Sequence, residues 1–405
     1  MLGRQARLSL SVVLTVLATV AVSATASAAP VLGPAGSAFY TPPSPLPGGA
    51  HGDLIWYRPT TVELGLSAPL VNAWLVLYQS QSINGRSDAV TGTVLEPATP
   101  WLGAGPRPVV DFAVGTQGMS QSSAPSFQLP AGTEYEAGDI VAALAAGWTV
   151  DVTDYAGYTN GAVPDYSVGA SEGHAVLDIA TAATQIPGAG ISPLAPTVTW
   201  GYSQGGQASA WAAQLWPSYD PGLRLLGDAS GGVPANPVAV AYNLNGNVAA
   251  AFLLYADIGL NVDYPQVNLP GHLNAAGVTA FAQAQSDSLT TAMATFAYHN
   301  IDEYTKNGET LTQLLAEPAN AAAVAAQQLG RVPIEVPVFQ YHAAADEIVP
   351  FAQDEALWQT YCSQGVTDDW NVYPGEHLSG DSEGAPFVVT WIAGRFAGLP
   401  APSNC

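Results

Sequence analysis

A serine in a glycine-rich turn is the residue with the clearest chemical potential in this sequence. Ser203 lies in the hexapeptide Gly201–Gly206 (GYSQGG), which follows an expected strand over 197–200 and precedes an expected helix over 204–215. In that context a tight, strained turn lifts the serine hydroxyl above the carboxyl edge of a sheet. Small flanking residues let the strand and the helix approach closely enough for the turn. The pattern therefore predicts a nucleophilic serine.

A serine nucleophile needs a general base, and the base needs an orienting carboxylate. Where this motif sits on a parallel sheet, the chain order is Ser, then Asp or Glu, then His. Asp346 follows an expected strand over 336–341, and His377 lies in the loop after an expected strand over 370–373. Because parallel strands end at the same edge of a sheet, we expect the three side chains to meet there.

The sequence offers alternative candidates for both the general base and the orienting carboxylate. His342 stands four residues before Asp346, at the end of the same expected strand, and Glu347 could replace Asp346. The remaining histidines are placed less well, because they precede the serine or lie in a later helical region: His51, His174, His272 and His299. We therefore predict the combination of Ser203, Asp346 and His377.

Donors for an oxyanion are expected at two places. One is the backbone N–H of Gln204, directly after the nucleophile, and the other is the loop 114–118 that follows an expected strand over 108–113. The glycines of that loop permit a close backbone approach, and Thr116 or Gln117 could add a donor. The alternative interpretation is an ordinary glycine turn.

The elements that must position these residues alternate along the chain. Two early strands that could pair antiparallel are expected over 74–78 and 89–95. Strands and helices then alternate over the following segments: 108–113, 135–146, 148–152, 171–184, 197–200, 204–215 and 223–229. This alternation predicts an α/β fold, with a mostly parallel sheet covered by helices on both faces. The Ala-rich segment 239–330 has apolar residues at helical spacing, such as Leu311, Leu314 and Leu315, and is expected to be a helical cap inserted into the core.

The two ends of the chain carry further signals. Arg4 and Arg7 precede an apolar run over 8–22, and Ala26-Ser27-Ala28 is an A-x-A site. This pattern predicts a signal peptide over 1–28 and export of the protein, because the run is too short to span a bilayer. A Pro- and Gly-rich arm over 29–50 follows. The core is then expected over 51–238 and 331–405, on either side of the insertion.

Composition narrows the range of partners. The 405 residues include 9 Lys and Arg against 32 Asp and Glu, for a net charge of −23, and 48% are hydrophobic. The apolar content suffices for a large core, so wholesale disorder is excluded. The charge argues against nucleic-acid binding, because little in the chain could neutralise phosphates. It also argues against binding to anionic membranes, so no stable membrane insertion is expected, and contact with a lipid interface would be transient.

The cysteines point to a disulfide rather than a metal site. The chain has two cysteines, Cys362 and Cys405. An even number of cysteines in an exported protein predicts one disulfide, which would pin the C-terminal tail to the body. No His, Cys and carboxylate cluster has a convincing ligand spacing, so no metal and no cofactor are expected.

Taken together, these motifs resemble those of the secretory lipase family, which includes fungal lipases of the lipase A type and secreted actinobacterial lipases. The resemblance rests on these segments: 115–118, 123–126, 154–158, 201–206, 229–232, 346–350, 375–378 and 395–405. It implies an α/β-hydrolase core, a helical cap and hydrolysis of acylglycerols or other carboxylic esters. Relatives often have Cys where Ser123 stands, which leaves the rigidity of the loop 114–126 open.

We therefore expect a secreted serine ester hydrolase, of the triacylglycerol lipase type, that works through an acyl-enzyme on Ser203. The alternatives are an acyltransferase or a short-chain esterase with the same triad. A secreted serine peptidase is a weaker alternative, because no amine-recognising acidic site or extra domain is evident. A non-catalytic binding protein usually lacks a triad residue, whereas all three types are present here.

Overall fold

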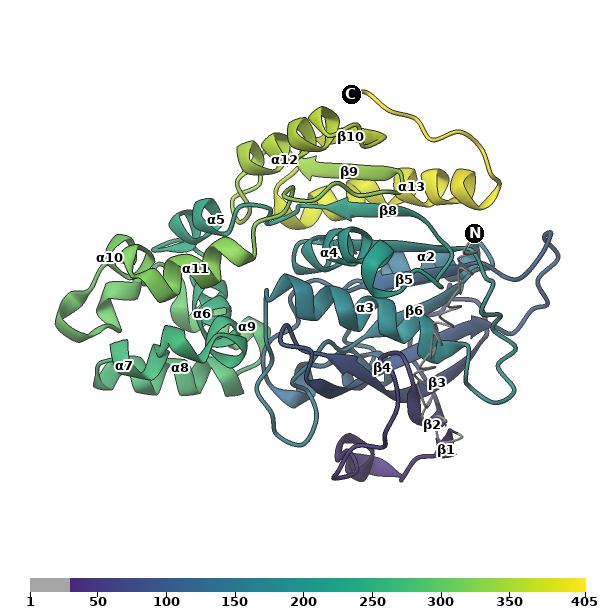
Figure 1. The fold of residues 1–405 in the computed structure, drawn as a ribbon, viewed down its shortest axis with the longest axis horizontal. Coiled ribbons are helices and arrows are strands. Elements are labelled where there is room, and N and C mark those ends of the chain that lie inside the picture. The colour runs from purple at the N-terminus through teal and green to yellow at the C-terminus, as the bar shows by residue number, and fades with distance from the viewer. Residues whose placement is uncertain (1–29) are drawn as a thin grey trace, which may run out of the picture.

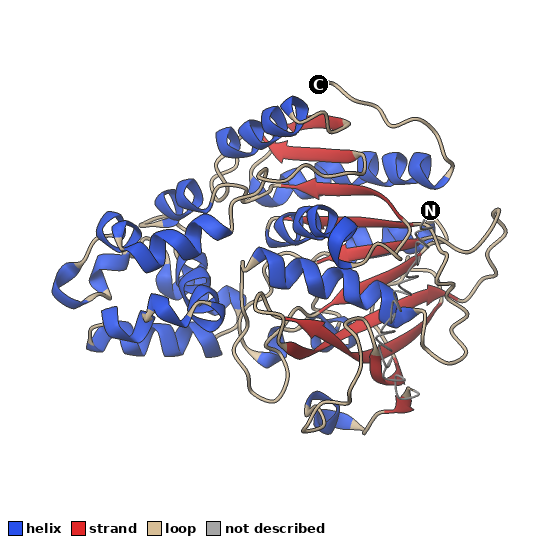
Figure 2. Cartoon of the chain, in the orientation of Figure 1, coloured by secondary structure: helices blue, strands red, loops and turns tan. Residues whose placement is uncertain are grey.

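The computed structural model describes residues 30–405, so the predicted signal peptide over 1–28 lies outside the described residues. The described chain forms one ten-stranded sheet with helices on both faces and a group of helices beyond one end (Figure 1, Figure 2). The strand order is β1-β2-β3-β4-β6-β5-β7-β8-β9-β10. The α/β architecture expected from the sequence is confirmed.

The pairing of the strands divides the sheet into two parts. The strands are β1 (Val31–Leu32), β2 (Leu54–Thr60), β3 (Val71–Gln81), β4 (Ser87–Pro97), β5 (Val109–Ala113), β6 (Thr149–Thr153), β7 (Thr197–Tyr202), β8 (Leu225–Gly231), β9 (Val338–Ala343) and β10 (Asp368–Tyr373). The pairs β2–β3, β3–β4 and β4–β6 are antiparallel, as suspected for the early strands. From β6 to β10 all neighbours are parallel, so their carboxyl ends share one edge.

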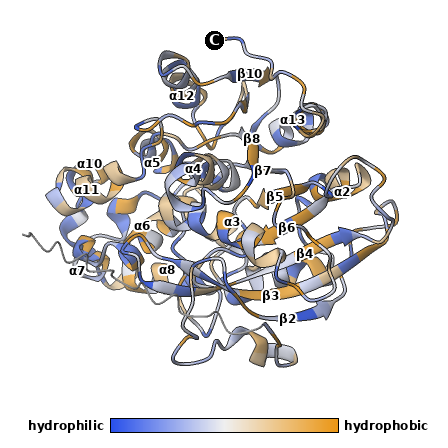
Figure 3. Ribbon diagram, turned by 45° about the vertical axis from the view of Figure 1, so that its right-hand side comes forward, coloured by the Kyte–Doolittle hydropathy of each residue, from blue (hydrophilic) through white to orange (hydrophobic). Residues whose placement is uncertain are grey.

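Helices pack on both faces of this sheet, so its central strands are buried. Every residue of β5, β6 and β7 is buried, which requires a cover on each side. Figure 3 shows these strands as the hydrophobic centre of the molecule. The covering helices are α1 (Pro125–Ala131), α2 (Ala137–Ala145), α3 (Gly169–Ala183), α4 (Gln204–Tyr219), α12 (Phe351–Ser363) and α13 (His377–Phe396). Helices α3 and α4 cover one face, and α2 and α13 the other (Figure 1).

A second group of helices, called here the helical segment, connects β8 to β9. It comprises α5 (Pro237–Leu244), α6 (Ala251–Asp263), α7 (Leu269–His272), α8 (Ala275–Ser286), α9 (Leu289–Phe296), α10 (Leu311–Ala316) and α11 (Pro318–Ala326). These helices have an apolar core of their own, which includes Leu254, Tyr255 and Phe281. In Figure 1 they lie beyond the carboxyl ends of β8 and β9, at the edge where we expect the site.

The C-terminal tail is held against the sheet. The disulfide Cys362–Cys405 joins the tail to the end of α12, as predicted. The side chain of Asn404 accepts a hydrogen bond from the backbone N–H of Trp370 and donates one to its carbonyl oxygen, in the edge strand β10. Among residues 30–405, the structure contains no helix of the length and apolarity needed to cross a membrane.

Candidate active site

Ser203 occupies the turn between β7 and α4 with a strained backbone. Its φ is 58° and its ψ is −120°, a conformation that side-chain-bearing residues rarely adopt. The neighbouring glycines make this turn possible. A side chain on Gly205 would collide with the carbonyl oxygen of Ala113, and one on Gly206 with that of Gly231. The GYSQGG pattern is therefore required by close contact between α4 and the strands β5 and β8.

The structure brings Ser203, His377 and Asp346 into one hydrogen-bonded chain. The Nε2 atom of His377 lies 2.9 Å from Ser203 Oγ, and its Nδ1 atom lies 2.7 Å from Asp346 Oδ2. Asp346 and His377 are buried, whereas the serine is partly exposed. Because Nδ1 faces a carboxylate, its proton is held there and Nε2 is left to accept the serine proton.

His377 is the first residue of helix α13, so the expectation that it lies in a loop is wrong. Glu376 caps this helix: its carboxylate accepts hydrogen bonds from the backbone N–H groups of Leu378 and Ser379. Glu347, the alternative acid, accepts from the backbone N–H of His377 at 3.1 Å. The two acids thus contact different parts of His377: Asp346 contacts its imidazole ring, and Glu347 contacts its backbone N–H.

Asp346 is held by several nitrogen donors besides His377. Its Oδ1 atom accepts hydrogen bonds from the backbone N–H groups of Ile348 and Val349, at 2.9 and 2.7 Å. The Nε2 atom of His342 lies 3.3 Å from its Oδ2 atom. His342, the alternative base, contacts Asp354 through Nδ1 and is buried within β9. His342 therefore contacts the carboxylates of Asp346 and Asp354, whereas His377 contacts the serine.

The expected oxyanion residues lie near Ser203, and buried side chains hold them in place. The side chain of Gln204 donates a hydrogen bond to Glu172 at 2.6 Å, and Thr116 Oγ1 lies 2.7 Å from the hydroxyl of Tyr166. Sequence reasoning missed Glu172 and Tyr166, because neither belongs to a motif. Gln204 is the first residue of α4, so its backbone N–H has no acceptor within the helix and is available at the site.

Gln117 contacts a group of buried acidic residues, called here the acidic wall, which consists of Glu134, Glu136, Asp139 and Asp381. Its side-chain amide donates to Glu134 at 2.9 Å and to Glu136 at 3.3 Å, and Glu136 also accepts from the backbone N–H of Gly115 at 2.8 Å. The Gln117 amide is therefore used within the wall, which leaves the backbone of the 115–118 loop as the possible oxyanion donor. The sequence offered no signal for the two glutamates.

Burial makes the carboxyl groups of the acidic wall harder to ionise than free carboxyl groups. Burial raises the pKa of Glu134 to about 7 and that of Glu136 well above its usual value. Burial and the nearby Asp381 raise the pKa of Asp139 to about 9. Asp139 shares a side-chain hydrogen bond with Asp381.

The loop 114–126, whose rigidity the serine at position 123 left open, is held together by hydrogen bonds. Ser123 Oγ lies 2.8 Å from Ser120 Oγ, and the carbonyl oxygen of Ser123 accepts a hydrogen bond from Gln128 at 2.6 Å. Ser126 donates two hydrogen bonds to the buried Asp154, from its backbone and from its hydroxyl. Hydrogen bonds therefore restrain the C-terminal part of this loop.

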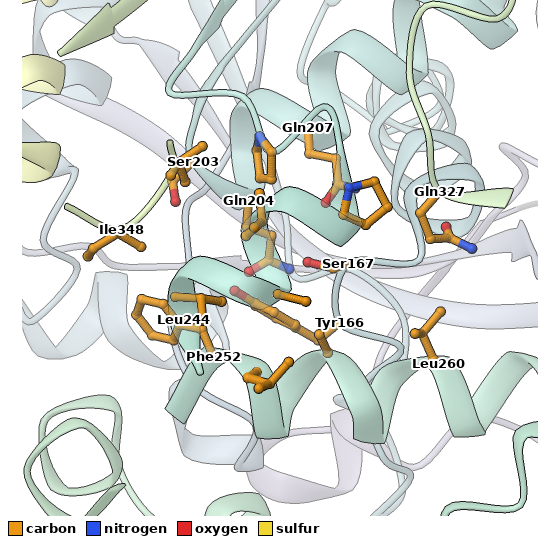
Figure 4. Close-up of a pocket in the computed structure, with 17 residues that line it drawn as sticks. Tyr166, Ser167, Ser203, Gln204, Gln207, Leu244, Phe252, Leu260, Gln327 and Ile348 are labelled. Atoms are coloured by element: carbon orange, nitrogen blue, oxygen red, sulfur yellow. The ribbon is translucent and has the colours of Figure 1, made fainter. Parts of the chain in front are cut away.

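Two cavities meet at Ser203. A narrow cavity of about 70 Å³ runs from the serine between α5 and α6 (Figure 4) and is lined mainly by apolar side chains, including Leu244, Phe252 and Ile348. A larger cavity of about 950 Å³ contains Ser203 together with His377 and the loop residues Thr116 and Gln117. His377 lines the larger cavity and not the narrow one, so the two sides of the serine differ.

One group of possible metal ligands lies in the helical segment. The side chains of His272, Glu309 and Glu317 approach one another within ligand distance. However, Nδ1 of His272 lies 3.2 Å from Glu309 and Nε2 lies 3.4 Å from Glu317. The two ring nitrogens thus face different carboxylates, and the histidine is held between two acids.

Comparisons with known proteins agree on one family. A family model described as secretory lipase matches residues 124–404. Lipase 10 of Candida albicans is 29% identical over 399 residues, covering 92% of this chain and 83% of its own. A Mycobacterium tuberculosis protein named probable inactive lipase MT1628 is 29% identical over 382 residues, covering 91% of this chain and 83% of its own.

A solved structure shows the same fold. The crystal structure of Candida antarctica lipase A superposes with a TM-score of 0.82 at 24% identity, covering 90% of this chain and 86% of that one. Together with the mostly parallel sheet, this similarity shows that the chain has the α/β-hydrolase fold.

Proposed function

The chain belongs to the secretory lipase family and is a carboxylic ester hydrolase, and from this premise we propose that it cleaves lipid esters through an acyl-enzyme on Ser203. The observation that carries the proposal is the hydrogen-bonded chain from Ser203 through His377 to Asp346, at 2.9 and 2.7 Å. No step of this reaction requires a metal or a cofactor.

In the first half of the reaction, Ser203 Oγ attacks the ester carbonyl carbon while His377 Nε2 takes the serine proton. Asp346 stabilises the imidazolium that forms. The tetrahedral oxyanion is stabilised by the backbone N–H of Gln204 and by the 115–118 loop. When the intermediate collapses, the alkoxide leaves with the proton from His377. Water then attacks the acyl-enzyme, His377 removes its proton, and the acid is released as Ser203 is restored.

The two cavities suggest how a lipid ester is oriented. The leaving alcohol must lie beside His377, which protonates it, and His377 lines the larger cavity. The acyl chain then extends into the narrow apolar cavity between α5 and α6 (Figure 4). An apolar lining favours an aliphatic chain, because burying each methylene contributes about 0.8 kcal/mol. This arrangement favours an acylglycerol over a small soluble ester as substrate.

Replacing the nucleophile tests the proposal. Ser203→Ala is expected to lower kcat for a p-nitrophenyl ester by at least about 10⁴-fold, because no other group can form the acyl-enzyme. The matched control is Ser218→Ala, at an exposed position of the same helix α4. Activity of Ser203→Ala close to that of the wild type would refute the mechanism.

A non-catalytic role is the second candidate, because one relative is named a probable inactive lipase. A fluorophosphonate probe distinguishes the two, since it phosphonylates an activated serine. We expect stoichiometric labelling of the wild-type protein and none of Ser203→Ala. Absence of labelling in folded wild-type protein would favour the non-catalytic role. Assays with an added alcohol would separate hydrolysis from acyl transfer.

We further propose that the protein is exported with cleavage after Ala28. The support is the A-x-A site at the end of the apolar run 8–22. Determining the N-terminus of the protein from culture medium tests this proposal, and the expected first residue is Ala29. Retention of the apolar run in the exported protein would refute it.

A further inference from the structure

A second histidine lies directly behind the proposed triad, and it is fully buried. His342 is in β9, four residues before Asp346. Its Nδ1 atom lies 2.6 Å from Asp354 Oδ2, in the first turn of α12. Its Nε2 atom lies 3.0 Å from the carbonyl oxygen of Val349 and 3.3 Å from Asp346 Oδ2. Both ring nitrogens therefore face oxygen atoms.

These contacts determine where the protons of His342 are. A carbonyl oxygen can only accept a hydrogen bond, so Nε2 carries a proton. Asp354 accepts further hydrogen bonds from the backbone N–H of Val233 and from the Gln340 amide, which favour its ionised form, although burial is the larger effect and raises the pKa of Asp354. When Asp354 is ionised, Nδ1 donates to this carboxylate as well, and the ring is then an imidazolium between two carboxylates.

The balance of charges agrees with this assignment. Burial lowers the pKa of His342, but the hydrogen bond to Asp354 and the charges of Asp354 and Asp346 outweigh it, so the net shift of this pKa is upward. The charged groups that face the ring are Asp346 from the loop after β9 and Asp354 from α12, with His377 of α13 beyond Asp346. Asp354 and Asp228 of β8 in turn raise the pKa of the buried Asp368 of β10. The rings of Phe351 and Trp370 also lie against the imidazole, with centroids 5.6 and 6.2 Å from its own.

We propose that His342 is a positioning residue for the ester hydrolase: a permanently charged imidazolium that orients Asp346 and moderates its basicity toward His377. This inference rests on the proposed function, because it assigns His377 as the base. His342 links Asp346 to Asp354 of α12, so the triad carboxylate is fixed from behind as well as by the backbone N–H groups of Ile348 and Val349.

The charge of His342 has a consequence that a purely structural side chain would not have. Removing a positive charge next to Asp346 leaves the carboxylates uncompensated, and their field then favours protonation of His377. Protonated His377 cannot accept the serine proton. The acidic limb of the kcat/KM profile should therefore move to higher pH when the charge is lost.

Replacing His342 with a neutral side chain tests this consequence. For His342→Gln we expect the acidic limb for a p-nitrophenyl ester to move up by about one pH unit. We also expect kcat on the plateau to fall about 10-fold from looser positioning. KM should be unchanged, because His342 lines neither cavity at Ser203. The matched control is His174→Gln, a partly buried histidine bonded to the carbonyl of Gln81 in another part of the fold. An unmoved limb in folded His342→Gln would overturn the proposal.

A second measurement does not depend on folding of that variant. In wild-type protein labelled with ¹⁵N-histidine, we expect both ring nitrogens of His342 to remain protonated up to at least pH 8. A neutral ring at pH 7 would overturn the proposal.

A further variant removes the other partner of His342. Asp354→Asn should shift the acidic limb of the kcat/KM profile in the same direction as His342→Gln, by a smaller amount. If Ser203→Ala were fully active, the proposed function would fail instead, whereas an inactive Ser203→Ala with an unmoved His342→Gln profile refutes only the role of His342.

Discussion

The sheet edge and the helical segment contribute to the site in different ways. At the edge, Ser203, Asp346 and His377 are fixed by strand ends, by a helix start and by hydrogen bonds of 2.7 to 3.1 Å. The helical segment offers apolar side chains, such as Leu244 and Phe252, from helices that rest on a separate core. The sheet edge thus holds polar atoms at defined distances, and the helical segment lines the narrow cavity next to them.

This difference follows from the interactions that each region uses. Hydrogen bonds depend on distance and angle, so parallel strands in fixed register are suited to holding reacting groups. Apolar contacts are non-directional, so helices can line cavities of many shapes with little effect on the chemistry. We therefore expect substitutions at the sheet edge to change kcat and substitutions in the helical segment to change selectivity for the acyl chain.

The largest effect is expected at the sheet edge. Asp346→Asn should lower kcat about 10⁴-fold, because the amide cannot stabilise the imidazolium and favours the wrong tautomer of His377. The control is Asp302→Asn, at an exposed position of the helical segment, which should be neutral. Steady-state kinetics with a p-nitrophenyl ester measures both. Loss of less than about 10-fold would mean that Asp346 does not orient the base.

An intermediate effect is expected in the helical segment. Ala256 of α6 lines the narrow cavity, and Ala256→Phe should shorten it. The ratio of kcat/KM for a long-chain ester to that for a butyrate ester should fall about 10-fold, with the butyrate rate nearly unchanged. Ala276→Phe, at an exposed position of α8, is the control. Equal losses for both esters would show that the two regions are not separable.

The smallest effect concerns stability and comes from the acidic wall on the sheet side. The folded-state pKa of Asp139 is raised from 3.8 to about 9 by burial and Asp381. The folded protein therefore binds the proton more tightly than the unfolded chain. This contribution is fully present below about pH 4 and is lost as pH rises toward 9. The melting temperature should accordingly fall across this range.

The variant Asp139→Asn lacks the titrating carboxyl group, and its side-chain amide can still donate a hydrogen bond to Asp381. Its melting temperature at pH 8.5 should exceed that of the wild type by about 2 °C, whereas the two should agree more closely at pH 5. Differential scanning calorimetry across pH measures the effect, with Asp302→Asn as the control. A wild-type melting temperature that rises from pH 5 to pH 8.5 would contradict this assignment of the acidic wall.

Some elements were predictable because their signals are local. The strands β5 and β7 are short apolar runs, and GYSQGG requires a tight turn wherever it joins a strand to a helix. Helix α13 shows the opposite case. It contains Gly380, Gly384 and Pro386, all unfavourable in a helix, and we did not predict it. Side chains at the two glycines would collide with Ala343 and Tyr341, so contact with the sheet requires these residues.

The amino-acid sequence by itself determined the alternation of strands and helices, the chemical types of the three proposed catalytic residues and their order along the chain. Tertiary structure alone decided that Glu347 bonds the backbone of His377 while Asp346 reaches the imidazole, and that His342 stands behind Asp346. It also decided the acidic wall around Gln117. The physical reason is that local signals report backbone preferences, whereas burial and hydrogen-bond partners are set by residues far apart in the chain that meet only on folding.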